Sequence, residues 1–158
     1  AYDLQPETFW RVRDKTMSGA QQAEARAGRK TPYGDLGVLD DLDAACGIVS
    51  SNQHETVDFL LDHFDIGGLF ETAYGREATV ESLDLRKPNP HYLERALADL
   101  DADSALFVGD NESDIKAAEN AGIDSAFIRR PHRTDWELNV WPTWDIDSLE
   151  DLHRVCSS

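Results

Sequence analysis

Short apolar runs alternate with helical segments over most of this chain, and this alternation constrains the fold more than any other feature. Apolar runs predict strands at 47–49, 71–74, 105–108, 125–128 and 143–146. Helical segments are expected near 53–64, 90–99, 114–121 and 148–155. Continuous apolar strands separated by helices are typical of a parallel sheet covered by helices on both faces. The sequence therefore predicts an α/β, Rossmann-like fold.

The first thirty residues have a different character, because they read as helix alone. Pro6 suits a first helical turn, and an Ala-, Gln-, Glu- and Arg-rich stretch runs to a possible end at Gly28. The linker at 31–35 then breaks the helical pattern. We therefore predict a helical segment at 1–32 and an α/β unit at 33–158.

Composition excludes several classes of protein. The 158 residues suffice for one domain, and 15 Lys+Arg against 31 Asp+Glu give a net charge of −16. Such a surface repels phosphate backbones, so no nucleic-acid partner is expected. No apolar run approaches the roughly 20 residues that span a bilayer, so no membrane partner is expected either. Two cysteines, Cys46 and Cys156, are too few for a disulfide scaffold and fit a cytoplasmic protein.

The ratio of Asp to Glu and of Arg to Lys is also informative. The chain has 20 Asp to 11 Glu, and 11 Arg to only 4 Lys. Abundant short carboxylates with few lysines favour a halophilic protein, because concentrated salt screens their mutual repulsion. The alternative is an acidic face for a basic partner, but the carboxylates are spread along the whole chain.

In an open α/β sheet, ligands bind beyond the carboxyl ends of the strands, so the residues that follow each strand are the candidate site. Ser50, Ser51 and Asn52 follow the first apolar run. Two hydroxyls beside the free N–H groups of a helix make a candidate phosphate cradle. Ordinary capping, with Asn52 as the cap and Glu55 three residues on, explains the same pattern.

Two carboxylates follow the clearest strand. Asp110 comes at its end after Gly109, and Asp114 follows one helical turn later. Mg²⁺ is usually held by one or two carboxylates plus waters and substrate phosphate, so this pair is a candidate Mg²⁺ site. The alternative is an acidic first helical turn that interacts with the helix dipole.

Lys87 lies between these two motifs in the sequence. It precedes Pro88, which restricts it to an extended conformation, and Asn89 and Pro90 read as the start of a helix. An ammonium fixed near carboxylates and a metal is suited to neutralise phosphoryl oxygens. An ordinary surface lysine before a helix is the alternative.

Taken in order, these motifs resemble the haloacid dehalogenase-like hydrolase superfamily. The resemblance rests on 47–52, 86–90 and 107–122 (FVGDNESDIKAAENAG) and extends from about Tyr33 to the end. It implies that Ser50 binds the transferring phosphoryl group and that Lys87 stabilises its charge. It also implies that Asp110 and Asp114 hold Mg²⁺, and that residues 1–32 are part of a helical cap.

The chain departs from this family at the nucleophile. The family's nucleophile and general acid/base are two aspartates of a DxD motif, at the end of a first central strand that precedes the cap. No predicted strand that ends in Asp-x-Asp precedes Ser50. We expect either a chain that lacks the segment with the first strand, and is therefore inactive by itself, or a natural homologue that has lost catalysis. A missing central strand would leave unpaired sheet edges.

The resemblance implies a Mg²⁺-dependent phosphatase that acts on a small phosphorylated metabolite through a phospho-aspartate. In that scheme Lys87 and Asp110 belong to the catalytic centre, and Ser50, Ser51, Asn52 and Lys87 bind the substrate. A phosphomutase and a binding or regulatory module without turnover are the alternatives. A dehalogenase is disfavoured, because it needs no Mg²⁺ and usually lacks the Gly109-Asp110 form.

One basic stretch stands out in the acidic chain. It covers 129–133 (RRPHR) and follows a predicted strand. It suits an anionic substrate or an acidic neighbouring face, although a solvated loop is the interpretation that the sequence favours.

Overall fold

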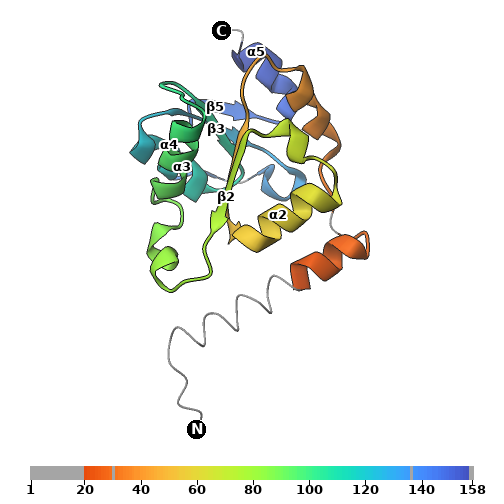
Figure 1. The fold of residues 1–158 in the computed structure, drawn as a ribbon. Coiled ribbons are helices and arrows are strands. Elements are labelled where there is room, and N and C mark those ends of the chain that lie inside the picture. The colour runs from red at the N-terminus through yellow and green to blue at the C-terminus, as the bar shows by residue number, and fades with distance from the viewer. Residues whose placement is uncertain (1–19, 30, 136, 157–158) are drawn as a thin grey trace.

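Between residues 47 and 156, five strands and four α-helices follow one another in the predicted order. The computed structural model describes residues 20–29, 31–135 and 137–156 (Figure 1). The strands are β1 (Gly47–Gln53), β2 (Thr72–Arg76), β3 (Leu106–Gly109), β4 (Asp124–Ile128) and β5 (Trp144–Ile146). The α-helices are α2 (His54–His63), α3 (His91–Asp99), α4 (Glu112–Ala121) and α5 (Leu152–Cys156). The short 3-10 helices are η1 (Gly34–Asp41), η2 (Gly67–Leu69), η3 (Glu81–Leu85), η4 (Pro131–Arg133) and η5 (Leu149–Asp151).

All strand pairs are parallel, which confirms the α/β fold class. β1 pairs with β2 in one sheet, and β3, β4 and β5 form a second sheet in that order. The sequence predicts one sheet, whereas the described residues form two. The reason is that, within the described part of the chain, no strand lies between β1 and β3 to join them.

Helices cover both sides of the strands. Figure 1 shows α3 and α4 on one side, and α2, η1 and α5 on the other. α3 turns Tyr92, Leu93 and Ala96 inward, and α4 turns Ile115 and Ala118 inward, at the spacing of a helix with one apolar face. α4 ends at Gly122, whose φ of 74° is a conformation that glycine adopts without strain, as the sequence predicts.

The main apolar core lies between the second sheet and the C-terminal segment. It is made of Ala126, Ile128, Ile146, Leu149, Leu152 and Val155. Leu36, Leu39 and Leu42, in and just after η1, pack against this cluster. η1 is not among the predicted elements, yet it packs its leucines against this core.

The N-terminal helical segment is described only in part. Residues 20–26 are helical and Gly28 follows with a φ of 74°. The guanidinium of Arg26 lies 4.7 Å from the centre of the Phe59 ring, so this segment contacts α2. Residues 1–19 and 30 of the predicted cap segment lie outside the described residues. Among the described helices, none has the length and apolar character to cross a bilayer.

Candidate active site

Lys87 joins the three sequence motifs at the carboxyl edge of the strands. Its Nζ donates to the carbonyl oxygen of Val49, where the register of the β1–β2 pairing begins to shift, at 3.3 Å. The same Nζ donates to Oδ1 of Asp114, in the first turn of α4, at 2.5 Å. The two charged side chains are 12% and 8% exposed, respectively. Motifs far apart in sequence therefore meet, because parallel strands bring their carboxyl ends to the same edge.

Asp114 is held from both of its carboxylate oxygens. Oδ1 accepts from Lys87, and Oδ2 accepts from the backbone N–H of Asn111 at 3.2 Å. Asn111 in turn accepts from the N–H of Ser113, so Asn111 and Asp114 form a capping box at the start of α4. The sequence offers two interpretations of Asp114, an acidic first turn of a helix and part of a charged site. Both describe the same side chain, because Asp114 caps α4 and also binds the ammonium of Lys87.

Gly109 gives Asp114 the room that this arrangement needs. A Cβ atom at position 109 would overlap the carboxylate and the Cβ of Asp114. We expect Gly109→Ala to lower the free energy of unfolding by about 1–3 kcal/mol, because Asp114 is fixed on both sides and cannot yield. Urea unfolding measures this loss. Gly37→Ala is the matched control, because a Cβ there meets nothing within 4 Å; equal stability of the two variants would contradict the close fit.

Asp110 lies at the end of β3 with its side chain 43% exposed. Its Oδ2 lies 2.9 Å from Nε2 of His132, which belongs to η4 after β4. Sequence reasoning placed Asp110 in the site but missed His132. The only available signal was its place in the basic stretch that follows a strand.

The serines and the asparagine after the first apolar run belong to β1 itself. β1 continues to Gln53, which is in register with Arg76 of β2, and the register shifts between Val49 and Gln53. The N–H of Asn52 donates to Oγ of Ser50 at 3.1 Å, which is a local turn. Ser50 directly follows the residue whose carbonyl binds Lys87, so it lies at the same edge, and Ser51 and Asn52 are exposed there.

The capping interpretation of Asn52 is wrong. Gln53 occupies the N-cap position of α2 and makes no capping hydrogen bond through its side chain. The pairing of Gln53 with β2 lengthens the strand past the apparent cap, so the pattern of Asn52 and Glu55 is out of place by one residue.

An apolar slot of about 720 Å³ separates the two sheets. Ile48 and Val49 of β1 and Phe107 and Val108 of β3 line it. Further apolar side chains come from η1 and its end and from α3: Leu36, Leu39, Leu42, Leu93, Ala96 and Leu97. Gly109 and Asp110 also line the slot, so the space between the sheets reaches the candidate site.

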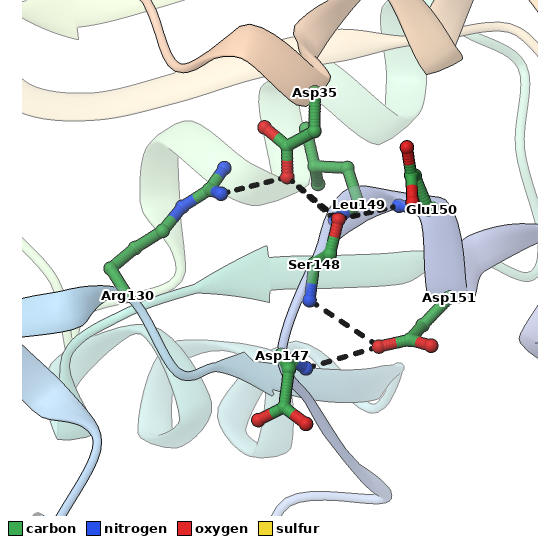
Figure 2. A network of polar contacts seen from close by, with 7 residues as sticks. All are labelled: Asp35, Arg130, Asp147, Ser148, Leu149, Glu150 and Asp151. Carbon is green, nitrogen blue, oxygen red and sulfur yellow. Dashed lines mark hydrogen bonds and ion pairs between the residues drawn. The ribbon is translucent and has the colours of Figure 1, made fainter.

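The basic stretch after β4 is paired with carboxylates of the same chain. Arg129 binds Asp145 through Nε at 2.9 Å and Nη2 at 2.8 Å, and its guanidinium is only 16% exposed. Arg130 binds Asp35 at 2.7 Å and is 13% exposed (Figure 2). The solvated-loop interpretation is therefore wrong for these two arginines, because acidic groups within the fold bind them.

Asp35 is the centre of the second of these pairs. Its Oδ2 accepts from Arg130, from the hydroxyl of Ser148 at 3.1 Å and from the N–H of Leu149 at 2.9 Å (Figure 2). Burial by itself raises the pKa of Asp35, but the hydrogen bonds from Arg130, Leu149 and Ser148 outweigh it and hold the pKa below its ordinary value. The network ties η1 to the end of β4 and to the start of η5.

The fit of a Mg²⁺ ion depends on Asp110 and Asp114. Both oxygens of Asp114 accept hydrogen bonds, and Asp110, whose side chain is 43% exposed, contacts His132 through Oδ2 and lines the slot. The described residues contain no group of three acidic, histidine or cysteine side chains that could hold a metal. The donor set therefore fits an ion that keeps most of its waters and takes one or two carboxylates, which is the usual protein site of Mg²⁺.

The chain is an α/β protein with parallel strands, in which Lys87 joins β1 to the first turn of α4, Asp110 directly follows β3, and Ser50 lies in β1 next to the Val49 carbonyl that binds Lys87. Residues 34–128, more than half of the chain, match the family profile described as haloacid dehalogenase-like hydrolase. This chain belongs to that family.

Individual relatives agree with this assignment. The pyrophosphatase PpaX of a Bacillus cereus strain is 31% identical over 114 residues, which are 70% of this chain and 51% of that protein. The PpaX of Bacillus velezensis is 29% identical over 129 residues, 80% of this chain and 58% of that protein. The chain thus spans about half the length of the curated relatives that it matches.

Solved structures share the fold at lower identity. A predicted phosphoglycolate phosphatase from Haemophilus somnus superposes with a TM-score of 0.60 at 24% identity, over 77% of this chain and 54% of that one. The HAD-hydrolase YfnB of Bacillus subtilis, whose structure is described as bound to magnesium, superposes with a TM-score of 0.62 at 18% identity, over 98% and 84%.

Proposed function

We propose that this chain carries the phosphate- and Mg²⁺-binding half of a phosphatase site for a small phosphorylated metabolite. The observation that supports it best is the contact of Lys87 with both Val49 and Asp114. It holds one ammonium between β1 of the first sheet and the first turn of α4, the helix that follows β3 of the second sheet. Family membership and the phosphatase names of the relatives point the same way.

Each residue has a defined task in this proposal. Lys87 and the hydroxyl of Ser50 bind oxygens of the phosphoryl group, whose charge is the main electrostatic load in phosphoryl transfer. Ser51 and Asn52, exposed at the same strand end, bind the remainder of the phosphate. Asp110, with Asp114 behind it, faces the metal. When bound, Mg²⁺ would supply positive charge that brings the phosphate and its nucleophile together.

The proposal requires an aspartate as the phosphoryl acceptor, and the slot between the sheets is the place for it to enter. β1 and β3 are edge strands of their sheets in the described part of the chain, each is parallel to its neighbour, and both line the slot. An extended apolar segment between them would pair with both edges and would end beside Asp110. In the proposed enzyme this segment supplies the acceptor aspartate.

Hydrolysis of phosphate esters with Mg²⁺ tests the proposal. The chain would be assayed at low and high KCl, alone and with a synthetic peptide in which an apolar strand ends in the Asp-x-Asp that the family resemblance implies. We expect turnover only with the peptide and Mg²⁺, and a loss of about 10²–10³-fold in Lys87→Ala and Asp110→Asn. The side chain of Asp110 is 43% exposed, so Asp110→Asn should leave the fold intact, and a loss of activity in this variant would not come from misfolding.

Lys116→Ala is the matched control, because Lys116 forms only an exposed pair with Glu119. Full activity in both Lys87→Ala and Asp110→Asn would refute the proposed roles. Binding of inorganic phosphate that depends on Lys87, without turnover under any of these conditions, would favour a binding module over a phosphatase.

A further inference from the structure

The loop that follows β4 is fixed at its root. Arg129 and Arg130 leave the strand in opposite directions, one to Asp145 on β5 and the other to Asp35 on η1. Both guanidinium groups are largely buried. The hydroxyl of Thr134 donates to the carbonyl oxygen of Pro131 at 3.3 Å and closes the turn. The loop is therefore held in one place relative to the sheet.

This fixed loop sets His132 over the end of the neighbouring strand. Nε2 of His132 lies 2.9 Å from Oδ2 of Asp110, and the two side chains are 48% and 43% exposed. Contacts between such exposed groups contribute little to folding stability. The contact does, however, place the imidazole against a carboxylate that lines the slot.

We propose that His132 is a positioning residue for Asp110, which orients the carboxylate toward the divalent cation. The inference rests on the proposed function, because it takes Asp110 as the cation ligand. Carboxylates that bind metals are themselves held by hydrogen bonds from surrounding groups, and loss of such a partner typically costs about 10–100-fold in metal affinity. The imidazole of His132 is the group that contacts Asp110 from β4's loop.

Binding of Mn²⁺ to the whole chain, measured by electron paramagnetic resonance, tests the proposal without relying on activity. Mn²⁺ replaces Mg²⁺ at oxygen ligands and is directly observable. We expect His132→Ala to weaken Mn²⁺ binding by about 10–100-fold. His132→Gln should restore most of the affinity, because the amide nitrogen of glutamine replaces Nε2 as a donor to Asp110. His63→Ala, at an exposed histidine on α2, should leave the affinity unchanged.

The outcomes separate the inference from the proposed function. If Asp110→Asn leaves Mn²⁺ binding intact, or if the unaltered chain binds no Mn²⁺ at millimolar concentration, the proposed metal site is wrong and the inference falls with it. If Asp110→Asn weakens binding but His132→Ala does not, only the positioning role is wrong. Tighter binding in His132→Ala would show that His132 competes with the cation, which also overturns the role proposed for it.

Discussion

Lys87→Met should lower the free energy of unfolding by about 3–5 kcal/mol. The reason is that Lys87 and Asp114 are 12% and 8% exposed, so the substitution leaves the carboxylate nearly buried without its counter-charge. The carbonyl of Val49 loses the same donor. Urea unfolding followed by circular dichroism measures the effect.

Two further variants decide whether the effect belongs to the buried pair. Lys116→Met breaks an exposed pair with Glu119 and should cost less than about 1 kcal/mol. Lys87→Met combined with Asp114→Asn should recover part of the loss, because the double variant buries no unpaired charge. Additive losses in the double variant would mean that the two side chains act independently, contrary to the structure.

The strands, the helices and the position of the candidate site at the carboxyl ends of the strands were predictable from the sequence. Apolar runs such as 105–108 and 125–128 are local signals, and Gly122 marks a helix end by itself. The contact between Lys87 and Asp114, in the first turn of α4, was also predictable, because parallel strands bring the segments that follow them to the same edge of the sheet. The roles of these side chains in catalysis remain predictions.

The contacts that complete the site were not predictable in the same way. His132 and Asp110 are 22 residues apart, and Arg130 and Asp35 are 95 residues apart. Neither pair lies on a periodic segment, so no spacing in the sequence indicates that they meet. In a chain with 31 acidic residues, composition also gives no reason to select one carboxylate as the partner of a given arginine.

The β1–α2 junction shows a third limit. The pattern around Asn52 favours a helix cap, and the local chemistry is sound. The strand nevertheless continues to Gln53, because Gln53 pairs with Arg76 on β2. A long-range pairing therefore overrides a local signal at the position where the candidate phosphate cradle lies.

Asp35→Asn should destabilise the protein by about 2–4 kcal/mol at neutral pH, and the loss should shrink in acid. The substitution leaves the guanidinium of Arg130, 13% exposed, without a counter-charge, although the amide oxygen still accepts from Ser148 and Leu149. Since the folded pKa of Asp35 lies below its ordinary value, its charge stabilises the fold above the unfolded pKa, near 3.9. That contribution disappears as the pH falls through the folded value.

Urea unfolding at a series of pH values from about 7 to about 3 measures this difference between the native chain and Asp35→Asn. Asp145→Asn is the comparison variant, because Asp145 is 48% exposed and its partner Arg129, although 16% exposed, also lies in the field of Asp135 and Asp147. Its loss should be smaller than that of Asp35→Asn, since two carboxylates still favour the charge of Arg129. An Asp35→Asn loss that is as large at pH 3 as at pH 7 would mean that the carboxylate's shape and hydrogen bonds, and not its charge, hold η1 against the end of β4.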